Sequence, residues 1–201
     1  MKTPDLVFGG RRLSSDHALV LAKVSPLPSA RETIRRAAGD GADLVLIGGD
    51  NPESLVGWAR ETFPSLVVGV AAERAEVARA ACAAGAELIS SRTLFDVAVE
   101  FGVGYVGSDV DAAVTAGVPR AGVVLDGGVA GPGSLPVVDG WPVAVDVPGD
   151  GTPGGLAVAA LAASAGVTII RTAHVRQTRH AVEMAASIAG TRPPAKAVRW
   201  E

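Results

Sequence analysis

The amino-acid sequence predicts an α/β fold, and among α/β folds it favours a closed TIM (β/α)8 barrel. Short apolar runs alternate along the chain with helix-length segments, which is the pattern of parallel strands joined by helices. Eight such runs can be recognised, the number that closes this barrel. Several of them end in a charged residue, as Val123–Asp126 does before Gly127 and Gly128. Because the strands of such a barrel are parallel, these charges are expected to converge on one face.

Length and composition bound the other possibilities. The chain has 201 residues, 48% of them hydrophobic and only 4% aromatic, so a single domain with a core of small aliphatic side chains is expected. The net charge of −3, with no basic patch, argues against nucleic-acid binding. No signal peptide or apolar run of membrane-spanning length opens the chain, so we expect a cytoplasmic protein without membrane contact. Cys82 has no possible disulfide partner and is expected to be a buried structural thiol.

The first half of the chain is expected to contain a hairpin and four strands. Leu6–Leu13, with Gly9-Gly10 at its centre, has the pattern of a small hairpin that precedes the barrel. The four strands are expected at His17–Val24, Leu44–Ile47, Leu66–Val70 and Glu87–Ile89. Helices are expected after a capping box of Ser29 with Glu32, after an Asn51 cap, over Glu73–Ala84 and over Thr93–Glu100.

The second half is expected to contain four more strands and one unusual connection. The strands are expected at Val103–Val106, Val123–Asp126, Val143–Asp146 and Thr168–Arg171. Helices are expected over Asp109–Ala116 behind a Ser108 cap, from Thr152-Pro153 to Ala165, and over Val175–Ile188. Gly127–Gly140 is rich in glycine and proline and has no helical period, so the sixth helix of the barrel is expected to be missing.

These elements predict one barrel domain over residues 1–190 and a flexible tail over residues 191–201, which contains Pro193-Pro194. The helices must be short, because a barrel of this type is typically about 250 residues long. An open, doubly wound parallel sheet is the alternative. The number of strands favours the barrel, and a sheet whose first and eighth strands do not pair would contradict it.

Four charged residues near strand ends are the first candidates for a functional site. Asp126 ends the sixth strand, and a carboxylate placed there must either face a pocket or anchor a loop. Asp146 ends the seventh strand, and a structural ion pair with Lys23 or Arg171 is its expected role. Arg171 is equally suited to hold an anionic ligand or to pair with Asp126. The three histidines and one cysteine lack metal-site spacing, so no metal and no cofactor are predicted.

Four segments, taken in chain order, resemble dihydropteroate synthases. Gly41–Asp50 reads Gly-Ala-Asp-Leu-Val-Leu-Ile-Gly-Gly-Asp and is similar to that family's second-strand signature, Gly-Ala-Asp-Ile-Ile-Asp-Ile-Gly-Gly-Glu. Ala75–Ile89 resembles the family's third helix and fourth strand, and Val124–Gly131 resembles its Leu-Asp-Pro-Gly loop. Ala157–Arg171 resembles its last helix and strand. The resemblance extends from about Leu6 to Ile188.

This resemblance implies a pterin-binding barrel that joins a dihydropterin pyrophosphate to p-aminobenzoate, with Mg²⁺ assisting the departure of pyrophosphate. By the resemblance, Asp126 would hydrogen-bond the pterin and Arg171 would correspond to the arginine of the eighth strand. Asp50, beside Asn51, would correspond to the carboxylate that follows the glycines of the second strand. The candidates for binding a pterin-like or anionic small molecule are Asp126, Arg171, Asp50, Asn51, Lys23 and Asp146.

Other positions depart from the family pattern. Leu46 and Ala71 stand where the family has aspartates, and Ser90-Ser91 stands where it has an Asn-Asp pair. Lys23 stands where the family has a metal-binding asparagine, and an ammonium group repels a metal cation. Each buried pterin partner that is lost costs about 1–3 kcal/mol of binding free energy. We therefore expect the family's fold with weakened or lost synthase activity.

Two functional hypotheses follow. In the first, the chain is a ligand-binding relative of dihydropteroate synthase with a reduced pocket around Asp126 and Arg171. In the second, it is a non-catalytic barrel that acts as a partner or regulatory subunit. We expect a homodimer. An open cavity lined by Asp126 and Arg171 would favour the first hypothesis, and a mouth filled by Leu46 and its neighbours would favour the second.

Overall fold

Parallel strands close into a barrel in the computed structural model, which describes residues 5–14, 16–131 and 133–193. Within these residues eight strands pair in the order β10-β3-β4-β5-β6-β7-β8-β9. Their bounds are β3 Leu19–Val24, β4 Leu44–Ile47, β5 Val67–Ala71, β6 Leu88–Ser90, β7 Gly104–Gly107, β8 Val123–Val129, β9 Val143–Asp146 and β10 Ile169–Thr172. Because β10 pairs with β3 over four residues, the predicted barrel is confirmed and the open sheet is excluded.

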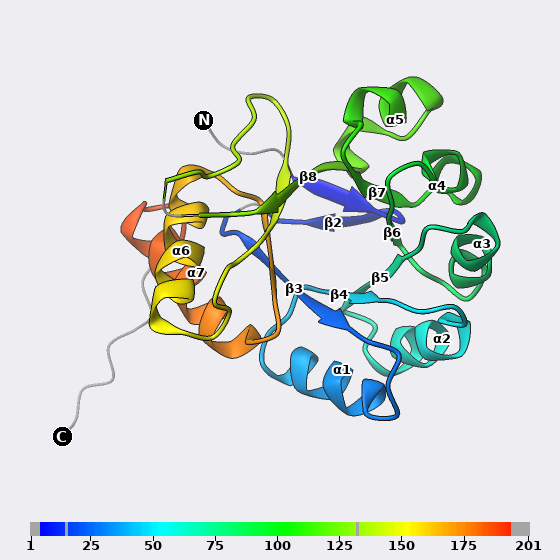
Figure 1. Cartoon of the computed structure of the whole chain (residues 1–201), viewed down its shortest axis with the longest axis horizontal. Helices are drawn as coiled ribbons and strands as arrows, with labels where there is room; N and C mark the ends of the chain where they lie inside the picture. The colour runs from blue at the N-terminus through cyan, green and yellow to red at the C-terminus, as the bar shows by residue number, and fades with distance from the viewer. Residues whose placement is uncertain (1–4, 15, 132, 194–201) are drawn as a thin grey trace.

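The helices form a ring around the strands, as Figure 1 shows. Their bounds are α1 Ala30–Gly39, α2 Glu53–Thr62, α3 Ala75–Ala83, α4 Phe95–Phe101, α5 Val110–Ala116, α6 Pro153–Ala165 and α7 Val175–Ile188. Two of them, α6 and α7, have the predicted bounds, and the Thr152 hydroxyl caps α6 by accepting from the Gly155 N–H at 3.1 Å. Among the described residues, no helix is long and apolar enough to cross a bilayer.

Three predicted helix caps are wrong. Ser29 precedes α1, but its ψ of 4° lies outside the extended region that directs a capping side chain, and it makes no side-chain cap hydrogen bond. The first bonds of α2 run to the carbonyl of Pro52, so the helix begins at Glu53 and Asn51 lies before its cap. Asp109, not Ser108, caps α5 by accepting from the Ala112 N–H at 2.9 Å.

Alternation along the strands separates two layers of core. In β3, Leu19 and Leu21 point into the barrel, while the alternate residues Val20, Ala22 and Val24 face the helices. The inward residues form one cluster: Leu19, Leu21, Leu44, Leu46, Val67, Leu88, Val106, Val124, Ala144 and Ile169. The barrel interior is therefore packed with side chains rather than open. The same alternation makes Lys23 the next inward position of β3, at the carboxyl end of the strand.

The predicted N-terminal hairpin is present, and the structure shows that it closes the floor of the barrel. Strands β1 (Leu6–Phe8) and β2 (Arg11–Leu13) pair antiparallel, and Leu6 and Phe8 join the inward cluster. Buried Glu87 fastens the hairpin, since its carboxylate accepts from Arg11 Nε at 3.1 Å and from Arg60 Nη1 at 2.7 Å. The hairpin therefore belongs to the core rather than to a separate appendage.

The connection from β8 to β9 has no helix in its described residues, which exclude position 132. This agrees with the prediction, although β8 continues to Val129 instead of ending at Asp126. Arg120 holds the connection against the barrel: its guanidinium lies 3.8 Å from the centroid of the Trp141 ring and donates to the Gly140 carbonyl at 2.8 Å.

The end of the chain is only partly described. Thr191 donates a hydrogen bond to the Asp16 carbonyl at 2.8 Å, which ties the start of the predicted tail to the floor of the barrel. Residues 194–201 of that tail lie outside the described residues.

Packing of the hairpin predicts the effect of one substitution. A Cβ at Gly104 would lie 2.1 Å from Cδ1 of Phe8, so we expect Gly104→Ala to lower the free energy of unfolding by about 1–3 kcal/mol. Urea denaturation measures the change. Phe8→Ala removes the clash, so adding Gly104→Ala to that variant should cost much less.

The matched control is Gly39→Ala at the end of α1, where a Cβ would meet nothing within 4 Å. The proposed contact would be contradicted if Gly104→Ala lowered the free energy of unfolding equally in the wild type and in the Phe8→Ala variant.

Candidate functional site at the barrel mouth

Four charged side chains meet at the carboxyl ends of the strands. Arg171 Nη2 of β10 donates to Asp126 Oδ1 of β8 at 2.6 Å and lies 3.1 Å from Asp146 Oδ2 of β9. Asp146 Oδ1 is also in contact with Lys23 Nζ of β3. We call these four residues the mouth network. All of them occupy inward strand positions, and pairing of Arg171 with Asp146 in the β9–β10 ladder brings their side chains together.

The mouth network is electrically balanced, with two carboxylates and two cations. Arg171 is only 6% exposed, so its guanidinium depends on its anionic partners to offset lost hydration. Within the described part of the chain, Arg171 Nε has no hydrogen-bond partner. Burial raises the pKa of Asp126, but hydrogen bonds from Arg171 and the Gly128 N–H, with the charges of Arg171 and Lys23, outweigh it and lower that pKa.

A bulge in β8 positions Asp126. The pairing of β8 with β9 shifts register between Asp126 and Val129, where two glycines take up the extra length. Gly128 adopts a φ of +66°, which residues other than glycine rarely adopt. Its N–H donates to Asp126 Oδ1 at 3.0 Å. The glycines that follow Asp126 within β8 therefore help to hold its carboxylate toward Arg171.

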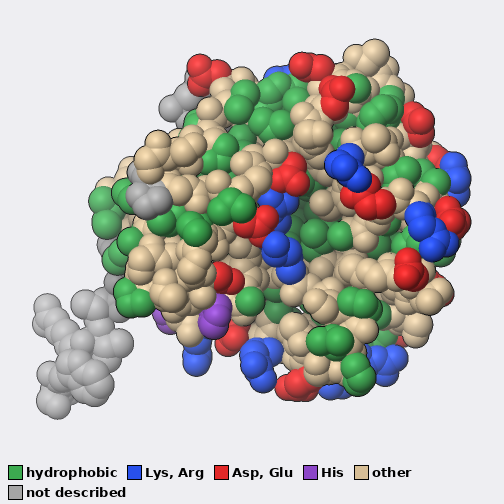
Figure 2. All heavy atoms as spheres, viewed as in Figure 1, with side chains coloured by type: hydrophobic (Ala, Val, Ile, Leu, Met, Phe, Trp, Pro, Cys, Tyr) green, Lys and Arg blue, Asp and Glu red, His purple; other side chains and the backbone are tan. Residues whose placement is uncertain are grey.

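A cavity of about 430 Å³ adjoins the network over the ends of β5 to β8. Its lining residues are Ala71, Ala72, Glu73, Ser90, Ser91, Arg92, Gly107, Ser108, Asp126 and Gly128. This volume lies within the range of small-molecule sites. In the face shown in Figure 2, acidic and basic side chains gather around a central hollow. Of the mouth network, only Asp126 is among the cavity's lining residues.

Two of the six predicted ligand-binding residues lie away from this network. Asp50 has an 80% exposed side chain, and its carboxylate is 3.5 Å from Arg74 on the surface. Asn51 is exposed beside it. Lys23, Asp126, Asp146 and Arg171 are brought together, which fits the structural ion pair expected for Asp146.

Leu46 fills the interior just below the mouth. It is 6% exposed and belongs to the inward cluster. Its Cδ1 lies only 3.3 Å from where a Cβ would stand on Gly69, so the leucine uses the space that this glycine leaves. The mouth is thus divided between a polar cavity on one side and filled, ion-paired positions on the other.

Three residues of the mouth were not foreseen: Arg92, Ser108 and Asp150. Ser108 lines the cavity, and Arg92 pairs with Glu73 at 3.4 Å on its rim. Asp150 accepts from the Thr172 hydroxyl at 2.6 Å and so joins the loops after β9 and β10. The only feature that these residues share in the sequence is a position one to four residues after a strand. Many other residues occupy such positions, so this feature does not single them out.

The residues present do not fit the Mg²⁺ ion that the family resemblance implies. Lys23 places an ammonium against Asp146, where a metal cation would be repelled. Over residues 5–14, 16–131 and 133–193 there is also no group of three or more acidic, histidine or cysteine side chains able to hold a metal.

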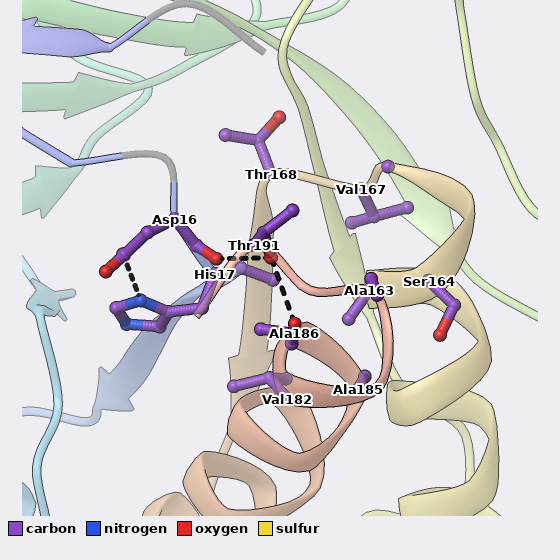
Figure 3. A pocket seen from close by; sticks show the side chains of 13 residues that line it. Asp16, His17, Ala163, Ser164, Val167, Thr168, Val182, Ala185, Ala186 and Thr191 are labelled. Atoms are coloured by element: carbon purple, nitrogen blue, oxygen red, sulfur yellow. Dashed lines mark hydrogen bonds and ion pairs between the residues drawn. The ribbon is translucent and has the colours of Figure 1, made fainter. Parts of the chain in front are cut away.

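A second cavity, of about 490 Å³, lies at the floor between the ends of α6 and α7. Figure 3 shows Asp16 turned toward His17, with Thr191 between Asp16 and Ala186. Much of the lining is alanine and valine. Barrels of this class carry their chemistry at the opposite face, where the strands end, so the mouth is the candidate functional site despite the larger floor cavity.

Cys82 is a structural thiol, as predicted. It is buried in α3, and burial together with the charge of Glu100 raises its pKa to about 11. The thiolate needed for nucleophilic or metal chemistry is therefore scarce at neutral pH.

Fold and site together define a TIM-barrel protein with a polar opening at the carboxyl ends of its strands. No protein-family model matches the sequence. Inactive dihydropteroate synthase 2 of Mycobacterium tuberculosis is 31% identical to the chain, with 94% of this chain and 89% of that protein covered. The Mycobacterium leprae protein of the same name is 30% identical, with 94% and 97% covered. The chain belongs to the dihydropteroate synthase family.

Solved structures agree with this assignment. Mycobacterium tuberculosis Rv1207 has a TM-score of 0.83 and 33% identity, with 94% of this chain and 99% of that chain covered. Dihydropteroate synthase of Yersinia pestis has a TM-score of 0.79 at 19% identity, covering 92% and 98%, which supports the fold. The alignment with the curated relatives is 282 positions long against 201 residues here, so this is a shortened member of the family.

The lowered pKa of Asp126 predicts a pH-dependent contribution to stability. Its carboxylate form is favoured in the folded protein, so its contribution is fully present above the unfolded pKa of about 3.9 and is lost as pH falls through the folded pKa. We expect Asp126→Asn to be less stable than the wild type at pH 7, and this difference to shrink progressively below about pH 4. Urea midpoints measured across this range provide the test.

Asp139→Asn, at an exposed loop position, serves as the control and should show no such trend. A stability difference for Asp126→Asn that does not change with pH would show that the ion pair is not its source.

Proposed function

We propose that this protein is a dihydropteroate synthase family member that does not catalyse the synthase reaction. The observation that carries this proposal is the mouth network, in which Lys23 and Arg171 are already paired with Asp146 and Asp126. A pyrophosphate-bearing substrate and its metal ion would have to displace these contacts. The curated relatives that carry the word inactive in their names support the same conclusion.

Loss of pterin partners supports the proposal independently. The family aspartates of the second and third strands are replaced by Leu46 and Ala71, and the Leu46 side chain is packed into the barrel interior. A pterin ring has fixed hydrogen-bond donors and acceptors, and each one left unsatisfied on burial costs about 1–3 kcal/mol. Two such losses weaken binding by roughly 30-fold or more, because about 1.4 kcal/mol corresponds to a factor of ten.

The cavity beside Asp126 supports a second candidate function, the binding of a pterin-like or anionic small molecule without turnover. Its volume of about 430 Å³ is sufficient, and Asp126 with three serines provides hydrogen-bonding groups. Two solved neighbours below 25% identity, which share the fold, were determined with pteroic acid (Coxiella burnetii) and with 6HMPPP (Thermus thermophilus). This candidate is compatible with loss of the synthase reaction.

The decisive test is a synthase assay with dihydropterin pyrophosphate, p-aminobenzoate and Mg²⁺. We expect no condensation product from the purified protein, because the charged groups of the mouth are mutually paired. The same protein is then titrated calorimetrically with the pyrophosphate substrate and with pterin alone. Any heat of binding that comes from the mouth should disappear in Asp126→Ala and persist in Asp139→Ala.

Product formation that Asp126→Ala abolishes would overturn the proposal. Binding without product would favour the ligand-binding candidate, and absence of binding at millimolar ligand would favour a partner or regulatory role.

We also propose that the protein is a homodimer, with α6 and α7 as the contact surface. No charged residue occurs in α6, and a helix that is apolar on every side is normally covered. Leu161 of α6 and Met184 and Ile188 of α7 are nevertheless exposed, by 51%, 57% and 81%. The two helices pack against each other. A cytoplasmic location completes the proposal, supported by the use of one unpaired cysteine.

Ile188→Asp should weaken the dimer by about tenfold or more, because a carboxylate buried at an interface without a partner is costly. Sedimentation or light scattering at matched concentrations measures the change in molecular mass. Leu27→Asp, at an exposed apolar residue after β3, is the control and should leave the mass unchanged. A wild-type protein that is already monomeric would contradict this part of the proposal.

A further inference from the structure

Lys23 is exceptional in its strand. Five of the six residues of β3 are buried, whereas Lys23 is exposed, with 56% of its side chain accessible. It stands at an inward position at the mouth, so its ammonium extends over the end of the barrel. The neighbouring inward residues of the adjoining strand ends are Arg171 on β10 and Leu46 on β4. Lys23 therefore introduces a charge into a strand whose other residues are all apolar.

The contacts of Asp146 explain what this charge does. One of its oxygens contacts Lys23 Nζ and the other lies 3.1 Å from Arg171 Nη2, so both oxygens face cations. The carboxylate of Asp126 on the next strand also faces Arg171. The four charges sum to zero. Without the ammonium they would sum to −1, and Asp146 would have one oxygen facing the mouth without a cation.

We propose that Lys23 is a tethered cation that holds the place of a divalent metal ion at Asp146 Oδ1, and that its ammonium excludes such ions from this oxygen. The proposal deepens the proposed function, since it assigns loss of metal binding to one side chain. Hard divalent cations take carboxylate and amide oxygens and complete their coordination with water. Asp146 and Asp126 supply such oxygens on neighbouring strands, and an asparagine at position 23 would add an amide oxygen.

The substitution Lys23→Asn should therefore create a divalent cation site. We expect Mn²⁺ to bind this variant with a dissociation constant of about 1 mM, typical of a weak oxygen-ligand site, and at least tenfold more tightly than it binds the wild type. Electron paramagnetic resonance of free Mn²⁺ measures the binding, with no pterin and no second substrate present. Lys23→Arg keeps a cation at the same place and should bind no more Mn²⁺ than the wild type.

Two further variants locate the site. Lys23→Asn combined with Asp146→Asn should lose the new Mn²⁺ binding, because the released carboxylate has been removed. Arg12→Asn removes a cation from the opposite end of the barrel, where Arg12 has a 75% exposed side chain, and should bind no additional Mn²⁺. Circular dichroism and thermal unfolding establish that each variant is folded.

Mn²⁺ binding by Lys23→Asn that Lys23→Arg and the double variant lack supports the proposal. Equal Mn²⁺ binding by the wild type and Lys23→Asn, or its absence in a folded Lys23→Asn protein, overturns it. Because the readout is metal binding alone, it is independent of turnover. A protein that forms dihydropteroate would refute the proposed function, whereas a folded Lys23→Asn protein without metal binding would refute only the role of Lys23.

Discussion

A buried guanidinium imposes the main constraint on the mouth of this barrel. Arg171 is 6% exposed and must keep anionic partners close to compensate for lost hydration. Those partners come from the ends of β8 and β9, so the order of strands β8, β9 and β10 around the barrel is what makes the arrangement possible. Lys23 arrives from the other side of β10 because β3 closes the barrel there. Closure of the sheet therefore also brings together the charges that make the mouth neutral.

The rest of the interior is apolar, and this concentrates the chemistry at one end. Below the mouth network the inward positions are filled by aliphatic side chains, and the hairpin inserts Leu6 and Phe8 from the floor. Glu87 and its two arginines hold that hairpin in place, so a buried ion pair is used at each end of the barrel, though for different purposes. At the floor the charges fasten two segments together. At the mouth they occupy the face on which barrels of this class act.

The two halves of the mouth differ in whether they leave space for a ligand. The half formed by β5 to β8 keeps a cavity with serine hydroxyls and the Asp126 carboxylate, which is suited to a small polar molecule. The half formed by β9, β10 and β3 is occupied by its own charges. Paired charges thus occupy one half of the mouth, while the other half keeps an opening beside Asp126. Such a site can keep space to bind a small molecule without the groups that a reaction needs.

The sequence by itself determined the strands, the presence of an N-terminal hairpin, the missing helix and the four charges of the mouth network. These follow from local rules, since alternation along a strand fixes which residues point inward and glycine or proline ends a segment. Only the tertiary structure decided which charges pair and which residues line the cavity. The sequence pattern places Asp50 and Asn51 after an apolar run much as it places Asp126, but Asp126 lies within β8 and the loop after β4 carries Asp50 and Asn51 to the surface. The direction that a loop takes depends on how it packs against segments distant in sequence. A local sequence pattern does not encode this packing.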